Sequence, residues 1–268
     1  MNLVAPYTRS VLANRSLWFW GVAFMALWFV LGAYVFSPGL APGRSAELTY
    51  TSAWFAVIAL FSLTTLAMTI AASMVFGTSA LAYGFRYSRL TPSAYALSGV
   101  VATAAMGTLF GLVMSGVVSA LFSAHFGWAI VPANLLAVVG IAALSGAFMM
   151  GLGTVLVLIV VNYLGLRNLS FVEFVPLALA YIFGLSQLFL ALPEWFLYLS
   201  PWNDMETLFF QAYSGSPATI VLTDGASGTL SGPLAAAALA GWVLVLVGLA
   251  TVLLRRIRPV AVEEGRQV

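Results

Sequence analysis

The stretch Tyr83-Gly-Phe-Arg-Tyr-Ser-Arg-Leu-Thr-Pro-Ser-Ala-Tyr95 is a short polar interruption between two long apolar runs. Thr91 is suited to cap free backbone N–H groups, and Pro92 is suited to the first position of a helix, where its missing N–H is not needed. Arg86 and Arg89 place two positive charges just before this helix start. The stretch therefore predicts a charged elbow between two membrane helices.

The composition of the whole chain agrees with membrane helices on both sides of the elbow. Of the 268 residues, 62% are hydrophobic and only 7% are charged, and the mean hydropathy is +1.05. A soluble domain carries roughly 25% charged residues, so this chain lacks the polar side chains that a water-facing surface needs. The composition predicts an integral membrane protein. The net charge of +2 is spread among the loops, which argues against a nucleic-acid partner.

Missing residue types exclude several kinds of chemistry. The chain has no cysteine, which excludes disulfides, thiol catalysis and cysteine-held iron–sulfur or zinc sites. All of its basic residues are arginines, so no lysine is present with which a Walker A loop could reach the phosphates of ATP. The only histidine is His125, which excludes a haem held by two histidines of one chain. We therefore expect no enzyme, cofactor or metal site in this chain.

Six apolar segments are long enough to cross a bilayer, whose hydrocarbon layer is ~30 Å thick and takes about 20 helical residues. The expected spans are residues 17–36, 52–82, 93–122, 132–163, 171–192 and 233–254. Runs of about 30 residues exceed that thickness at ~1.5 Å per residue, so these helices tilt or project beyond the bilayer. The sequence predicts one all-α transmembrane domain over residues 1–268.

The arginine positions indicate how these helices cross the membrane. With both termini inside, nine arginines are cytoplasmic: Arg9, Arg15, Arg86, Arg89, Arg167, Arg255, Arg256, Arg258 and Arg266. Only Arg44 is then outside, as the positive-inside rule expects. An odd number of spans would destroy this asymmetry. We therefore expect six spans with both ends in the cytoplasm.

The N-terminal residues 2–15 have apolar residues at helical spacing, interrupted by polar ones. Such a pattern is typical of an amphipathic helix that lies along a membrane surface. Tyr7, Arg9 and Arg15 are its candidate interfacial residues, and both arginines suit the cytoplasmic side. This segment is expected to lie along the cytoplasmic surface of the membrane.

Residues 193–232 are expected outside, between the last two spans, and their first half is rich in aromatic residues. The break at Ser200-Pro201 and a capping-box pattern at Asn203-Asp-Met-Glu206 predict two short helices, each too short to span. Because Trp and Tyr favour the headgroup level, the pair is expected to dip into the outer leaflet. It serves either as an interfacial anchor or as an outer gate formed by Pro193, Glu194, Trp195, Tyr198, Pro201 and Trp202.

Three smaller features each allow a structural and a functional interpretation. Gly107, Gly111 and Ser115 recur at four-residue spacing, which favours close helix packing and also suits a lined cavity. Ser170 and Glu173 form a capping-box pattern at the start of the fifth span, where Glu173 is also a candidate for a transport path. His125 is expected in an outer turn, as an interfacial residue or as a group that titrates near neutral pH.

Taken together, the amphipathic N-terminal helix, six spans, basic elbow and proline-broken aromatic pair resemble a known family. They look like the membrane subunits of type-2 ATP-binding-cassette exporters, and the likeness covers nearly the whole chain. Its local pieces are Arg86-Tyr-Ser-Arg-Leu-Thr-Pro-Ser-Ala-Tyr95 and Leu192-Pro-Glu-Trp-Phe-Leu-Tyr-Leu-Ser-Pro201.

The resemblance implies a half-transporter in the cytoplasmic membrane of a prokaryote. Two permease copies or homologues pair in the lipid bilayer, and two separate cytoplasmic ATPases, which hold ATP and magnesium, dock beneath them. The elbow would be the coupling helix that sits on the ATPase, through Arg86, Tyr87, Ser88, Arg89, Leu90, Thr91 and Pro92. In the same way, the N-terminal helix would support it at the membrane surface and the outer helical pair would cap the exit.

The low charge of the spans predicts an amphipathic, lipid-linked or drug-like substrate that is moved outward. Two other functions stay open. An ion-coupled secondary transporter usually needs carboxylates within the membrane or broken helices at its midplane. A structural subunit of a larger membrane complex would bind a cofactor or lipid with its aromatic residues.

Overall fold

The computed structural model describes residues 4–40, 43–164, 170–185, 193–221 and 227–257. Nearly all of them are helical, and five helices are long and apolar enough to cross a membrane. These are Arg15–Tyr34, Arg44–Val75, Pro92–Phe126, Leu135–Leu164 and Gly232–Leu254. The helical membrane class predicted from the sequence is confirmed at this level. The sixth span and the cytoplasmic location of the termini stay predictions.

The two helices that flank the elbow are longer than the predicted spans. Helix α4 (Arg44–Tyr87) is one unbroken helix of 44 residues, and at ~1.5 Å per residue it is about twice as long as a ~30 Å hydrocarbon layer is thick. Helix α5 (Pro92–Phe126) begins at the predicted position, where the Thr91 hydroxyl accepts a hydrogen bond from the Ala94 N–H, and ends at the left-handed Gly127. Hydropathy underestimated both helices because their polar ends remain helical outside the apolar run.

The N-terminal part contains a short helix followed by the first predicted span. Helix α1 (Val4–Leu12) is separated from the span by Asn14, whose side-chain oxygen caps the next helix by accepting from the Ser16 and Leu17 N–H groups. The span consists of α2 (Arg15–Trp18), the π-helical turn η1 (Phe19–Ala23) and α3 (Phe24–Tyr34). A π-helical turn is invisible to hydropathy, so the sequence predicted only a continuous helix.

The fourth predicted span is α6 (Leu135–Ile159), continued by the π-helical turn η2 (Val160–Leu164). The described part of the fifth comprises the 3-10 helix η3 (Ser170–Phe174), α7 (Val175–Leu179) and the π-helical turn η4 (Ala180–Gly184). This part is too short to cross a membrane on its own, and residues 186–192 of the predicted span lie outside the described residues. Pro176 lies in the first turn of α7, where a helix tolerates proline.

The region before the last helix differs most from the sequence prediction. Helix α9 (Glu194–Leu199) and helix α10 (Pro201–Ser214) are separated at Ser200-Pro201 as predicted. The antiparallel strands β1 (Thr219–Val221) and β2 (Ser227–Thr229) pair Ile220 with Gly228, so the all-α prediction was wrong for this small hairpin. Helix α11 (Gly232–Leu254) follows.

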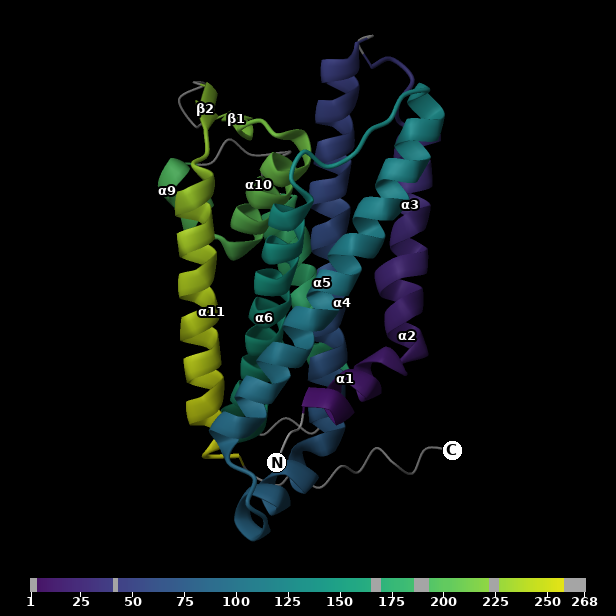
Figure 1. Cartoon of the computed structure of the whole chain (residues 1–268). Helices are drawn as coiled ribbons and strands as arrows, with labels where there is room; N and C mark the ends of the chain where they lie inside the picture. Colours follow the sequence, from purple (N-terminus) through teal and green to yellow (C-terminus); the bar gives the residue numbers. More distant parts are fainter. Residues whose placement is uncertain (1–3, 41–42, 165–169, 186–192, 222–226, 258–268) are drawn as a thin grey trace.

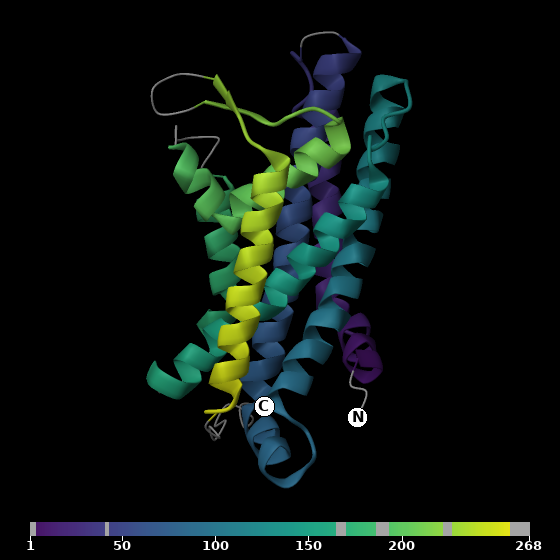
Figure 2. The same cartoon turned by 60° about the vertical axis from the view of Figure 1, so that its left-hand side comes forward.

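The long helices run side by side, and α1 lies across one end of the bundle (Figure 1). That end also contains the α4–α5 connection and the end of α11, whereas the hairpin, α9 and the start of α4 lie at the opposite end (Figures 1 and 2). Helices α4 and α6 form the core, with α10 packed against α4, α6 and α11. The candidate site consists of a pocket beside α4 and of buried polar side chains on α10.

Candidate functional site

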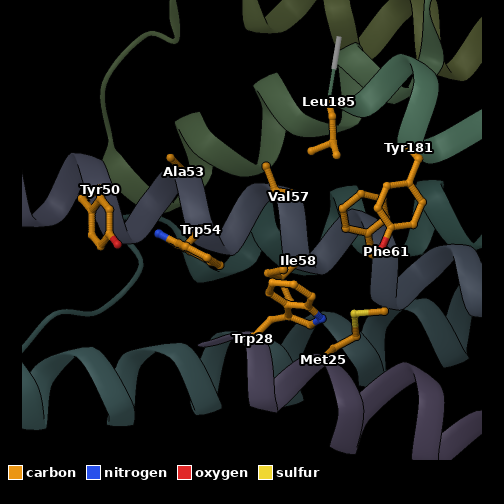
Figure 3. Close-up of a pocket in the computed structure, with 10 residues that line it drawn as sticks. All are labelled: Met25, Trp28, Tyr50, Ala53, Trp54, Val57, Ile58, Phe61, Tyr181 and Leu185. Atoms are coloured by element: carbon orange, nitrogen blue, oxygen red, sulfur yellow. The ribbon is translucent and has the colours of Figure 1, made fainter. Parts of the chain in front are cut away.

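A pocket of about 380 Å³ lies between α3, α4 and the end of η4 (Figure 3). We call it the aromatic pocket, and it is lined by Met25, Trp28, Tyr50, Ala53, Trp54, Val57, Ile58, Phe61, Tyr181 and Leu185. The six lining residues from α4 follow the three- and four-residue spacing that places side chains on one helix face. Small-molecule sites are typically apolar clefts of ~300–1,000 Å³, so this pocket is at the lower end of that range.

The position of the rings around this pocket is set by direct contacts. The Tyr50 hydroxyl donates a hydrogen bond to the Gly32 carbonyl at 2.9 Å. A side chain at Gly32 would begin 2.7 Å from the Trp54 ring, so glycine lets this indole lie directly against α3. On the other side, the rings of Phe61 and Tyr181 lie side by side with centroids 4.5 Å apart (Figure 3). These contacts hold aromatic faces from three segments around one space.

A second feature is the polar first half of α10, which is buried in the protein. Asn203, Asp204 and Glu206 expose 0%, 1% and 8% of their surface. Atoms of all three side chains lack a hydrogen-bond partner among the described residues, as do Ser200 Oγ and Trp202 Nε1. Burying polar atoms without partners is costly. Several such atoms on one short helix mark it as a candidate for function rather than for stability.

Burial changes the acidity of both carboxyl groups on α10, a helix too short to cross the membrane. It raises the pKa of Asp204 to about 8 and the pKa of Glu206 well above its ordinary value. The cause is desolvation, which disfavours the charged form of an acid. Carboxyl groups perturbed in this way cluster at functional sites.

Glu206 lies against Gly184, whose neighbour Leu185 lines the aromatic pocket. A Cβ atom added at Gly184 would be 3.1 Å from Glu206 Oε1 and 2.7 Å from Leu60 Cδ2, so these three residues meet at one point. The next residues in sequence, Leu185 and Phe61, line the pocket. The segments 60–61 and 184–185 therefore separate the carboxylate from the pocket, and we call them the pocket wall.

On the other side of η4 lies a smaller pocket of about 260 Å³, lined by residues of α6, α9, α10, α11 and η4. The Phe183 ring stacks on Trp202 with centroids 5.4 Å apart, and Trp202 meets Phe148 edge-on at 5.7 Å. Phe183 and Tyr181 thus place one η4 residue in each pocket. π-helical turns recur at functional sites, which fits the position of η4 between the two.

The predicted coupling residues lie at the exposed end of the α4–α5 pair. Arg86 and Tyr87 end α4, Ser88, Arg89, Leu90 and Thr91 form the connection, and Pro92 begins α5. No separate helix lies in the described residues between α4, which continues to Tyr87, and α5, which begins at Pro92, so the coupling role that the family resemblance implied for Arg86–Tyr95 stays a prediction. The Ser88 hydroxyl stabilises the sharp connection by donating to the Gly84 carbonyl and accepting from the Leu90 N–H. Arg86 and Arg89 are exposed.

The predicted interfacial residues lie on or next to α1. Tyr7 points into the bundle, where its hydroxyl donates to Met150 Sδ at 3.6 Å and its ring meets Tyr95 edge-on at 6.4 Å. Arg9 and Arg15 are exposed. Helix α1 is therefore anchored to α5 and α6 on one side and presents its charges on the other.

The predicted gate residues do not share one environment. Trp195 is exposed and Glu194 lies at the start of α9, whereas Tyr198 accepts a hydrogen bond from the Ser231 N–H. Pro201 and Trp202 are buried at the start of α10. Helix α10 packs among α4, α6 and α11 and therefore lies inside the protein, whereas the dipping of the helical pair into the outer leaflet stays a prediction.

The capping box predicted at Asn203-Asp-Met-Glu206 was wrong. Helix α10 begins at Pro201 with Ser200 before it, so Asn203 lies inside the helix, and its amide atoms cap nothing. Pro201 starts the helix earlier than the Asn203–Glu206 pattern suggested, since proline favours the first helical position.

The remaining predicted residues are placed as follows. Gly107, Gly111 and Ser115 are buried in α5, and the two glycines lie against Ala142 of α6. Glu173 is half-buried in η3, whose first residue is Ser170. His125 lies in the last turn of α5 rather than in a loop, with its Nε2 2.9 Å from Ser37 Oγ.

Sequence reasoning missed the aromatic pocket and the burial of Asp204 and Glu206. The spacing of Tyr50, Trp54 and Phe61 on α4 was a usable signal for the pocket. The burial of the two acids had no comparable signal, because a polar, aromatic segment between spans reads as an interfacial one.

Comparison with models of protein families gives no match for this chain, and comparison with curated proteins gives none either.

Proposed function

We propose that this chain is the membrane subunit of an ATP-driven exporter in the cytoplasmic membrane of a prokaryote. A separate cytoplasmic ATPase would bind magnesium and hydrolyse ATP, and this chain, paired with a second copy or a homologue, would move an amphipathic or drug-like molecule outward. The observation that carries the proposal is the continuity of α4. One unbroken helix includes six lining residues of the aromatic pocket and carries the exposed Arg86 in its last turn.

Continuity of α4 matters because an α-helix transmits displacement along its axis. A push on the α4–α5 connection would shift the Tyr50–Phe61 face relative to α3 and η4, which form the other sides of the pocket. Such a change of pocket shape is what an exporter needs in order to release a bound molecule. Helix α4 would thus connect the docking point of the ATPase to the binding site as one rigid element.

The exposed connection supports a partner at this end. The α4–α5 connection lies at one end of the bundle (Figure 2), and its exposed Arg86 and Arg89 could both be engaged there by a partner with an acidic groove. The absence of lysine from the sequence means that this chain has no Walker A loop. Energy from ATP would have to enter through another chain.

The test is charge reversal of the connection in the full chain expressed in its own membranes. The double variant Arg86→Glu/Arg89→Glu should lose the ATPase activity that purifies with the wild-type chain and should lose ATP-dependent transport. The matched control is Arg255→Glu/Arg256→Glu, which reverses two exposed arginines at the same end of the bundle. If the Arg86/Arg89 variant keeps an associated ATPase and transports at the wild-type rate, the docking role is wrong.

The two buried carboxyl groups favour a second candidate, a proton-coupled secondary transporter. Asp204 and Glu206 lie inside the protein without partners among the described residues, as expected of groups that carry protons through a membrane protein. Purified chain in vesicles separates the two functions. Uptake driven by an imposed proton gradient without any ATPase would favour this candidate over the exporter.

A further inference from the structure

We propose that the aromatic pocket binds a lipophilic organic cation and that the Glu206 carboxylate behind the pocket wall selects for its positive charge. This inference names the substrate class of the exporter proposed above, and it rests on that function only for the later fate of the bound molecule. The binding itself is a property of the chain alone.

The lining of the pocket fits a cation with an apolar body. Five of its ten residues are aromatic, namely Trp28, Tyr50, Trp54, Phe61 and Tyr181. The face of an aromatic ring attracts a cation, most strongly where water is excluded, and tryptophan is the best such ring. The other lining residues are aliphatic or Met25, and none is basic. The pocket therefore offers contact area to any apolar molecule and an additional attraction to a positive one.

The side chain of Glu206 supplies a matching charge. It is 8% exposed, and Oε1 has no hydrogen-bond partner among the described residues. Asn203, one turn earlier on the same face of α10, is fully buried, and neither of its amide atoms has a partner there. Polar groups buried without partners are expected to have a purpose beyond stability.

The pocket wall meets the carboxylate and lines the pocket with residues that are neighbours in sequence. Gly184 meets Glu206 and Leu60 on one side, and the adjacent Leu185 and Phe61 line the pocket on the other. Because Gly184 has no side chain, Oε1 lies close to the η4 backbone instead of being pushed away. Coulomb attraction is stronger in an apolar medium than in water at the same distance, so a cation in the pocket is stabilised by this carboxylate without touching it.

The simpler explanation is that Glu206 is a buried neutral acid. Protonation would remove the cost of the charge, but it would leave a carboxyl group whose Oε1 still has no hydrogen-bond partner. It would also not explain why aromatic faces gather on the other side of the wall. A cation in the pocket would favour the ionised carboxylate electrostatically, and it accounts for the aromatic faces on the other side of the wall.

The experiment measures binding to the purified full chain in nanodiscs of phosphatidylcholine, which carry no net lipid charge. The probes are tetraphenylphosphonium and tetraphenylborate, which have nearly the same size and shape but opposite charge. Binding is followed with ion-selective electrodes, and the signal of empty nanodiscs is subtracted. The wild-type chain should bind the cation at least about tenfold more tightly than the anion, and the variant below measures how much of this preference comes from Glu206.

The variant is Glu206→Gln, which keeps the shape of the side chain and removes its charge. It should weaken tetraphenylphosphonium binding at least about tenfold and leave tetraphenylborate binding unchanged or stronger. The matched control is Asp204→Asn, which removes the other buried carboxyl group of α10. Residues two positions apart point about 200° apart around a helix, so this control should bind the cation as the wild type does.

Each result decides the inference. Equal wild-type affinity for the two probes, absence of cation binding, or full cation affinity in Glu206→Gln would overturn it. The wild-type comparison needs no variant, so a folding defect in Glu206→Gln does not remove the test. Cation binding that depends on Glu206 without an associated ATPase would support the site and count against the exporter, whereas ATP-dependent export that is indifferent to Glu206 would do the reverse.

Discussion

Replacing Gly107 with alanine should force α5 and α6 apart. A Cβ atom at this position would lie 2.2 Å from the Ala142 carbonyl oxygen and 3.1 Å from the Gly146 Cα atom. Both contacts are with backbone, which cannot rotate away as a side chain would. Gly146 is the counterpart on α6, where a Cβ would lie 2.2 Å from the Thr103 carbonyl oxygen. The two helices are therefore in backbone contact at this crossing.

The size of the effect follows from two opposing contributions. Overpacking a close contact typically costs ~1–3 kcal/mol, and a shift of ~1 Å between packed surfaces loses a quarter to a half of their dispersion energy. Alanine has a helix propensity more favourable than glycine by up to ~1 kcal/mol. Because the contact is with backbone, we take the upper end of the overpacking cost, ~3 kcal/mol, and subtract ~1 kcal/mol for helix propensity, so Gly107→Ala should lower the free energy of unfolding by about 2 kcal/mol.

The control is Gly116→Ala in the same helix, where an added Cβ atom meets nothing within 4 Å. This variant should be neutral or stabilised by up to ~1 kcal/mol through propensity alone. Both variants are compared with the wild type by unfolding in detergent, followed by circular dichroism. If Gly107→Ala and Gly116→Ala have the same stability within ~0.5 kcal/mol, the close α5–α6 contact does not exist as described.

Three further outcomes are expected. Because burial raises the pKa of Asp204 to about 8 from 3.8, the folded protein keeps a proton that the unfolded chain has lost. Its stability should therefore fall as the pH rises from about 4 to 8 and level off above that. Melting curves recorded across this pH range should show a shallower fall for Asp204→Asn than for the wild type. The same pH dependence in both proteins would contradict this expectation. Thr91→Ala removes the cap on the Ala94 N–H and should lower stability by about 1 kcal/mol in detergent unfolding, whereas an unchanged midpoint would show that the cap contributes nothing. Tyr50→Phe removes the hydrogen bond to the Gly32 carbonyl and should cost ~0.5–1.5 kcal/mol in the same assay, an expectation that fails if the variant is as stable as the wild type.

The buried acids of α10 bear on both candidate functions. A carboxyl group inside the protein is tolerated when it is protonated, whereas an ionised carboxylate needs a positive charge nearby. In either an exporter or a proton-coupled transporter, a cationic ligand in the aromatic pocket would therefore favour loss of the proton from Glu206, and a protonated Glu206 would weaken binding of the cation. The two candidate functions differ in their source of energy, and the charge-reversal variant Arg86→Glu/Arg89→Glu tests whether that source is an ATPase docked on the α4–α5 connection.

Much of the fold could be predicted from the sequence. The helical membrane class follows from an apolar content that no water-facing surface tolerates. The start of α5 at Thr91-Pro92 and the break at Ser200-Pro201 follow from local backbone chemistry, since proline and side-chain caps act within one turn. Signals of this kind need no knowledge of the rest of the chain.

Other features depended on which segments meet in space. Helix α10 reads as an interfacial helix in the sequence, yet its acids are buried because α4, α6 and α11 surround it. The aromatic pocket needs Trp28, Trp54 and Tyr181 from three separated segments, and Gly184 matters only because Glu206 lies against it. Local sequence determines where helices begin and end, because caps, prolines and apolar runs act over a few residues. Long-range packing alone decides which polar groups lose their contact with water, and with it where the candidate site lies.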